Sequence, residues 1–236
     1  MDHINEFGDE RQKAWCLHCA RALVNLKTNR DHVPTKTLLH APYPENLPVV
    51  EVCAECNEGF SSDEQYLVAF LGSVVSGSTE PSRQRNPNAA RILSKKARLR
   101  ARIERSKTEY KTLGGEERLT WKAEIERVKH VVLKNARGHA FFELGEPMLG
   151  DPSHVSVLPL LSLSPAERHQ FESAQGLEIW PEVGSRMMTR LLTGQDLDDG
   201  WVIVQDDVYR YAVSQMGGVR VKSVLSEYLA TEVAWN

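Results

Sequence analysis

Two Cys-x-x-Cys pairs constrain the fold of this chain more than any other feature of its sequence. Cys16 and Cys19 form the first pair, Cys53 and Cys56 form the second, and the chain has no other cysteine. Each pair presents two thiolates from one tight turn, and four thiolates complete the tetrahedral coordination of a structural Zn²⁺. The pairs therefore predict that two segments separated by 33 residues meet around one zinc ion.

The cysteine count also bears on where the protein works. Because all four cysteines belong to the two pairs, none is left for a disulfide framework, which predicts an intracellular metal site. Residues 1–10 contain neither a basic region nor an apolar one, so we expect no signal peptide. The apolar stretch over residues 66–77 is too short to span a bilayer. We expect a cytoplasmic protein that does not contact a membrane.

Three polar residues lie between or directly after the cysteine pairs. Asp31 and His32 are adjacent, and Asn57 follows Cys56. Carboxylate and amide oxygens suit Mg²⁺ or Mn²⁺. Neighbouring residues of an extended segment point to opposite sides, so Asp31 could hold a divalent ion while His32 faces a water molecule. An Asp-His pair by itself is usually no more than a polar pair on the surface.

The order of these residues resembles the HNH (His-Asn-His) nuclease family, over about residues 16–66. The stretches that carry the resemblance are Asp31-His32-Val33-Pro34, Asn46-Leu47 and Cys53-Ala-Glu-Cys56-Asn57. The resemblance implies a small ββα-metal fold, whose zinc-bearing members have two such cysteine pairs.

The resemblance also implies a role for each residue. His32 would be the general base that deprotonates water, and Asp31 and Asn57 would hold one catalytic Mg²⁺ or Mn²⁺. Asn46 would fix the loop that orients His32. The last motif position is Asn57 rather than His, a replacement that active family members also have. Phe60 stands where many members have a basic residue, so another cation would have to bind the substrate phosphate.

Positive charge is concentrated in one segment. Residues 83–107 contain ten basic residues and one acid, a net charge of +9, so the rest of the chain carries −12 to give the total of −3. Such a segment can bind a polyanion locally. The residues that we expect to contact nucleic acid are Lys36, Arg91, Lys95, Lys96, Arg98 and Arg102. The alternative is a solvated helix that pairs with Glu116, Glu117, Glu124 and Glu126.

The sequence divides into three expected regions and an α+β fold. Residues 1–72 would form the zinc-stabilised nuclease module, with short strands and loops over 31–52 and a helix that begins at Ser61 or Ser62. Residues 73–118 would form a linker and a basic amphipathic helix over 89–111. Residues 119–236 would form an α+β region of unknown role.

Several elements are expected within that last region. A helix is predicted over 119–144, and Ser164-Pro165 is a typical helix start. Residues 201–205, 208–214 and 219–224 alternate apolar and polar side chains, which predicts an antiparallel β meander. His139 and Glu143 lie four residues apart and could ligate a metal, although packing is the expected role. The tryptophans expected to anchor the core are Trp180, Trp201 and Trp235.

These observations predict a metal-dependent HNH endonuclease that acts on nucleic acid, with DNA favoured over RNA. One such site nicks one strand, so a double-strand break would need a homodimer or two successive events. Two other functions stay open at this point. The chain could be a nuclease effector subunit with a partner protein in a larger assembly, such as a phage-defence complex. It could also be a non-catalytic zinc-finger module that binds nucleic acid.

Overall fold

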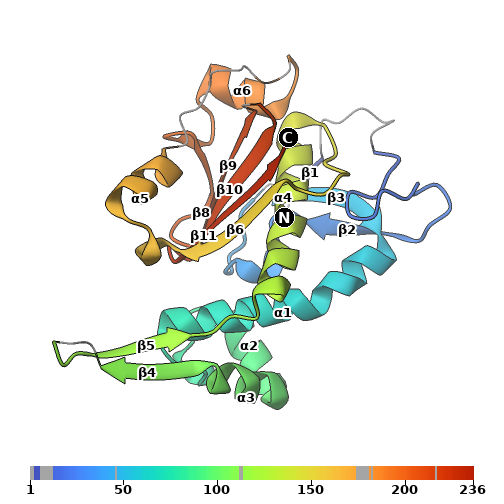
Figure 1. The fold of residues 1–236 in the computed structure, drawn as a ribbon. Coiled ribbons are helices and arrows are strands. Elements are labelled where there is room, and N and C mark those ends of the chain that lie inside the picture. Colours follow the sequence, from blue (N-terminus) through green and yellow to red (C-terminus); the bar gives the residue numbers. More distant parts are fainter. Residues whose placement is uncertain are drawn as a thin grey trace.

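The computed structural model describes residues 3–5, 13–45, 47–111, 114–173, 181, 183–215 and 217–236, and the fold is α+β (Figure 1). A small sheet near the N-terminus and a larger C-terminal sheet lie on either side of one helix, α4 (Ile125–Leu144). The described part of the chain contains no helix that is long and apolar enough to cross a membrane.

The N-terminal sheet has three strands in the order β1-β3-β2. Strand β3 (Leu47–Cys53) pairs in parallel with β1 (His3–Asn5) and antiparallel with β2 (Thr28–His32). A single-turn helix, η1 (Lys36–Leu38), lies in the connection between β2 and β3. Helix α1 (Ala54–Ser76) follows β3 without a loop, so the chain forms a β2–β3–α1 unit.

Helix α1 begins earlier than the sequence predicts. We expected a start at Ser61 or Ser62, but the first helical residue is Ala54. The Sγ atom of Cys53 accepts a hydrogen bond from the Cys56 N–H at 3.4 Å and so caps the helix. The prediction was wrong because a thiol took the role that Ser and Asp usually have at this position. As a consequence, Asn57 lies in the first turn of a 23-residue helix.

The basic region is not one helix, and the helix expected over 119–144 is shorter. The observed elements are α2 (Pro87–Lys95), α3 (Ala97–Arg105), β4 (Lys107–Lys111) and β5 (Glu117–Trp121), preceded by the short helix η2 (Pro81–Arg83). Lys96 has φ −115° and ψ 71°, which separates α2 from α3. Strands β4 and β5 pair as a hairpin that projects from the body of the molecule (Figure 1), and this pairing replaces the ends of both predicted helices.

Helix α4 packs on α1 and on β3, and also on strands of the C-terminal sheet. A glycine allows its close approach to the N-terminal unit. A Cβ atom at Gly138 would lie 2.6 Å from a side-chain carbon of Val33, the residue that follows β2. Any larger residue at position 138 would therefore push α4 away from the end of the strand that carries Asp31 and His32.

The C-terminal sheet is antiparallel, with the strand order β6-β11-β10-β9-β8-β7. Its strands are β6 (His154–Pro159), β7 (Leu197–Asp198), β8 (Trp201–Gln205), β9 (Tyr209–Gln215), β10 (Val219–Leu225) and β11 (Leu229–Trp235). The predicted meander is confirmed as β8, β9 and β10. The sheet also contains β6, β7 and β11, which had not been assigned as strands.

The remaining helices flank this sheet. They are η3 (Leu160–Ser162), α5 (Pro165–Glu172) and α6 (Arg186–Thr193). The predicted helix start at Ser164 is confirmed, and Ser164 and Glu167 form a capping box.

Polar side chains from α4 enter the core between α4 and the C-terminal sheet. His139 Nε2 lies 3.0 Å from the Tyr209 hydroxyl. Glu143 accepts hydrogen bonds from the Tyr211 hydroxyl at 2.6 Å and from Arg190 Nε at 3.1 Å. Both residues are fully buried, and neither belongs to the cysteine group that could hold a metal. Trp201 and Trp235 are buried as predicted, whereas Trp180 lies outside the described residues.

Candidate metal centre and the polar site beside it

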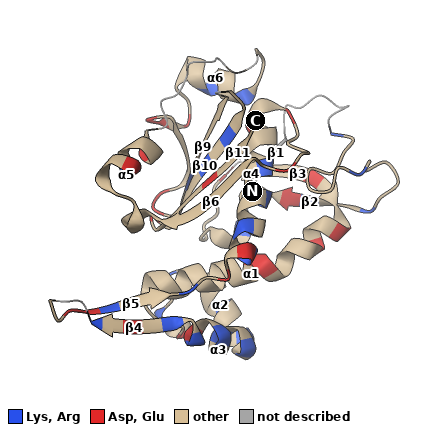
Figure 2. Ribbon diagram, viewed as in Figure 1, with Lys and Arg blue, Asp and Glu red and all other residues tan. Residues whose placement is uncertain are grey.

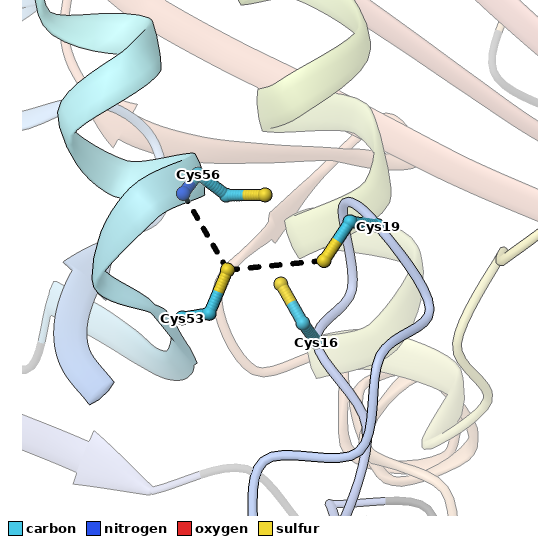
Figure 3. Close-up of side chains that lie close together, drawn as sticks. All are labelled: Cys16, Cys19, Cys53 and Cys56. Carbon is cyan, nitrogen blue, oxygen red and sulfur yellow. Dashed lines mark hydrogen bonds between the residues drawn. The ribbon is translucent and has the colours of Figure 1, made fainter. Parts of the chain in front are cut away.

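The four cysteine side chains come together at one point, as the sequence predicts (Figure 3). Their Sγ atoms all lie within 4.8 Å of one another, and Cys19 Sγ lies 3.8 Å from Cys53 Sγ. A tetrahedron with Zn–S distances of about 2.3 Å has S···S edges of about 3.8 Å. A disulfide would need about 2.05 Å, and all four thiols are free. The donor set and its spacing therefore suit zinc.

Two different backbone structures supply the thiols. Cys16 and Cys19 belong to a tight turn in which the Ala20 N–H donates to the Cys16 carbonyl at 2.9 Å. Ala20 has a φ of 55°, a left-handed conformation. Cys53 ends β3 and Cys56 lies in the first turn of α1 (Figure 3). The cluster therefore fastens an N-terminal loop to the junction between β3 and α1.

Arg21 supplies positive charge beside the thiols. Its Nε atom donates to Cys19 Sγ at 3.3 Å, and its Nη2 atom lies 3.6 Å from Cys53 Sγ and 2.5 Å from Glu55 Oε2. Burial acts to raise the pKa of the Cys19 thiol, but hydrogen bonds from Arg21 and from the neighbouring Cys56 and Cys16 together outweigh it and lower that pKa to about 6. A thiolate, the form that binds zinc, is therefore favoured at Cys19 near neutral pH.

His18 belongs to a second polar site next to the cysteines. His18 is not a member of the cysteine cluster, although it lies between Cys16 and Cys19 in sequence. Its Nε2 atom lies 3.7 Å from Asp31 Oδ2, and its ring packs edge-on against Phe60 with centroids 4.7 Å apart. Burial lowers the pKa of His18, so its imidazole is neutral at pH 7.

Asp31 is buried, and its charge is neutralised by a residue from α4. The Nζ atom of Lys134 lies 2.8 Å from Asp31 Oδ1, and the Lys134 side chain is only 2% exposed. Burial acts to raise the pKa of Asp31, but interactions with His18 and Lys134 outweigh it and hold that pKa below its usual range. Asp31 therefore carries its negative charge at neutral pH.

Lys134 also joins Asp31 to α1 and to the loop after β2. Its Nζ atom lies 2.5 Å from Glu64 Oε1 and 3.0 Å from the Thr35 hydroxyl. Asn135 Oδ1 accepts a hydrogen bond from the Thr35 N–H at 3.1 Å. Sequence reasoning did not single out these four residues. The sequence did contain a signal for a buried polar site, since Lys134 and Asn135 interrupt an apolar part of α4. Their partners could not be identified from it, because Glu64 and Thr35 lie about 70 and 100 residues away in the chain.

The structure places the other predicted site residues in the same β2–β3–α1 unit. His32 is the last residue of β2, opposite Val49, and Asn57 lies in the first turn of α1; both are half-buried. Within the described residues, no hydrogen bond joins Asn57 to Asp31. Asn46 lies outside the described residues.

The donor atoms beside the cysteine cluster suit a hard divalent ion in chemical type. Asp31 offers carboxylate oxygens and Asn57 an amide oxygen, the ligands that Mg²⁺ and Mn²⁺ prefer. One Asp31 oxygen already contacts Lys134, so an ion would have to bind beside that ammonium or replace it. In the described part of the chain, the cysteines are the one group of three or more His, Cys, Asp or Glu residues spaced to hold a metal ion.

The predicted phosphate-binding residues separate into exposed and paired groups. Basic residues colour much of α3 in Figure 2. The exposed members are Arg91, Lys95, Lys96 and Arg98. Arg102 is also exposed but pairs with Glu124 at 2.6 Å, and Lys36 Nζ lies 4.5 Å above the ring of Tyr43.

The alternative interpretation of the basic segment was a solvated helix that pairs with four downstream acids. In the described part of the chain, one of these four acids pairs with a residue of the segment. Glu124 pairs with Arg102 of the basic segment. The other three pair outside it: Glu116 with Arg118, Glu117 with Lys111 and Glu126 with Lys129.

Comparisons of this chain with protein-family models, with curated proteins and with solved structures found no match.

Proposed function

We propose that this protein is a metal-dependent HNH endonuclease that hydrolyses phosphodiester bonds of nucleic acid, with DNA as the favoured substrate. The observation that carries the proposal is the β2–β3–α1 unit itself. Asp31 and His32 end its first strand, Asn57 lies in the first turn of its helix, and four cysteines fasten the junction between strand and helix. A zinc-finger module that only binds nucleic acid uses its zinc and its basic residues, but it does not need Asp31, His32 and Asn57 in this order.

In this proposal His32 is the general base. Asp31 is buried and His32 is half-buried, in keeping with side chains that leave an extended strand on opposite sides. His32 removes a proton from a water molecule as its oxygen forms a bond to phosphorus, and the bond from phosphorus to the departing 3′ oxygen breaks. Histidine is the side chain that most often accepts a proton in such a step. Asn46 would position the loop that orients His32.

The two kinds of metal have separate proposed roles. Zinc on Cys16, Cys19, Cys53 and Cys56 is structural, because four thiolates leave no open coordination position for substrate. Asp31 and Asn57 would hold Mg²⁺ or Mn²⁺, which when bound supplies positive charge to the phosphate in the transition state.

The basic residues of α2 and α3 would bind the nucleic-acid backbone. Lys95, Lys96 and Arg98 are exposed, and Arg102 is also exposed but pairs with Glu124 through its Nε atom. If these residues bind duplex DNA, the logarithm of the binding constant should fall with the logarithm of salt concentration, with a slope of about −0.9 for each phosphate that they neutralise.

Replacing Lys95, Lys96 and Arg98 together by alanine should weaken binding and make the salt slope shallower by about 0.9 for each phosphate that is no longer neutralised. Lys129→Ala, on the exposed side of α4, serves as the matched control and should leave both unchanged. Fluorescence anisotropy with a labelled duplex, without added Mg²⁺, measures the affinity. An unchanged slope in the triple variant would remove α2 and α3 from the interface.

Cleavage of supercoiled plasmid tests the proposed activity. The purified, zinc-loaded protein is incubated with Mg²⁺, with Mn²⁺ or with EDTA, and zinc content is measured in each sample so that loss of structural zinc is recognised. We expect nicked or linear products that require the added divalent ion and that follow the protein through gel filtration. A folded, zinc-loaded protein that cuts neither DNA nor RNA with either ion would refute the proposal.

A further inference from the structure

One buried ammonium lies between two carboxylates from different elements. Lys134 Nζ, on α4, lies 2.8 Å from Asp31 Oδ1, on β2, and 2.5 Å from Glu64 Oε1, on α1. The Lys134 side chain is 2% exposed and the Asp31 side chain 8%. The three groups together carry one negative charge, in a place that solvent scarcely reaches.

Structural attachment alone is a weak explanation for this ion pair. A buried ion pair contributes little net stability, because the loss of hydration offsets much of the mutual attraction, and apolar side chains of similar size often serve as well. Helix α4 already has apolar contacts at Val128, Val131 and Val132. The attachment of α4 to the N-terminal unit therefore does not explain why a lysine reaches Asp31.

We propose that the ammonium of Lys134 occupies the cation position at Asp31, so that a divalent ion binds this carboxylate only when the Lys134 side chain withdraws. The significance of this competition for cutting rests on the proposed nuclease function. The physical reason is that the two cations would have to occupy the same space next to the Asp31 carboxylate. A Mg²⁺ ion binds oxygen at about 2.0–2.1 Å, and the space next to Asp31 Oδ1 is filled by Lys134 Nζ. On the other oxygen, His18 Nε2 lies 3.7 Å from Oδ2.

The contacts around Lys134 connect its position to the C-terminal region. Asn135, the next residue of α4, accepts a hydrogen bond from the Thr35 N–H, and Gly138 abuts Val33. The same helix packs on β6, β9, β10 and β11. A shift of α4 against the C-terminal sheet would therefore move Lys134 relative to Asp31.

Metal binding to full-length, zinc-loaded variants tests the inference without measuring activity. Lys134→Met keeps the length of the side chain and removes its charge. We expect it to bind Mn²⁺ at least tenfold more tightly than the wild type, by electron paramagnetic resonance of free Mn²⁺ and by calorimetry. Lys129→Met, on the exposed face of α4, is the matched control and should bind as the wild type does. The gain should vanish in Lys134→Met/Asp31→Asn.

If Lys134→Met does not fold, a second variant can still test the inference. Lys134→Met/Glu64→Gln removes one positive and one negative charge, leaves the local net charge unchanged and should show the same tighter Mn²⁺ binding. Equal Mn²⁺ affinity in the wild type and in the folded variants would overturn the inference, as would a gain that persists without the Asp31 carboxylate.

The two proposals fail in different ways. Tighter Mn²⁺ binding by the Lys134 variants, with no cutting by any protein, would support the competition and refute the nuclease. If the wild type cuts plasmid and the Lys134 variants bind Mn²⁺ no more tightly than it does, the nuclease proposal is supported and competition between Lys134 and the divalent ion is refuted.

Discussion

Replacing His32 by alanine is expected to lower the rate of plasmid cleavage by about 10²–10⁴-fold, the usual contribution of a general base. The side chain is half-buried at the end of β2, so its removal opens no large cavity in the core. Zinc content, melting temperature and affinity for DNA should therefore stay close to those of the wild type. Initial rates of nicking, measured with matched protein concentrations, give the size of the effect.

A second histidine provides the matched control. His154 is exposed at the start of β6, at the edge of the C-terminal sheet, and His154→Ala should cut as the wild type does. If His32→Ala keeps full activity, His32 is not the general base. If both variants lose activity to the same extent, the loss reports a general effect of histidine removal and not catalysis by His32.

Replacing Cys53 by serine is expected to abolish stoichiometric zinc binding and to unfold the N-terminal unit. Zinc binding and folding of such a unit are one equilibrium, and structural zinc contributes about 10–16 kcal/mol in zinc-finger peptides. Serine is nearly isosteric with cysteine and is a preferred residue at a helix N-cap, so the cap of α1 is preserved. The substitution therefore removes the function of residue 53 as a metal ligand while keeping its ability to cap α1.

Zinc per chain, measured by mass spectrometry, and amide hydrogen exchange over β2, β3 and the start of α1 report the outcome. Val24→Ser, at an 83% exposed position near the first cysteine pair, controls for the introduction of a serine and should change neither. A Cys53→Ser protein that keeps one zinc and full protection from exchange would show that this thiol is not a required ligand.

The parts of the fold that could be predicted from the sequence are those with local signals. Two cysteine pairs predicted that four thiols meet at one point, because each pair presents two thiols from one turn and a structural zinc needs four ligands. The Ser164 cap and the alternation over β8, β9 and β10 likewise depend on neighbouring residues. Asp31, His32 and Asn57 were assigned to one unit from motif order, and all three lie in the β2–β3–α1 unit.

The parts that could not be predicted depend on residues distant in sequence. A thiol from the cysteine cluster caps α1, so the Ser and Asp residues that predicted a later start lie inside the helix. The β4–β5 hairpin replaced helical ends because cross-strand pairing outweighed the helical spacing of apolar residues. Lys134 meets Asp31 only because α4 crosses the N-terminal unit, and no pattern within either segment specifies that crossing.

The close contact between Gly138 and Val33 has a consequence for how this protein could be divided or recombined. Helix α4 packs on both the cysteine-bearing unit and the C-terminal sheet, and at Gly138 no side chain separates its backbone from the first of these. A protein engineer who grafts residues 13–76 onto another scaffold would leave Asp31 without its counter-ion and Thr35 without Asn135. The smallest transferable piece therefore extends through α4, although the motif that suggests a nuclease ends well before that helix begins.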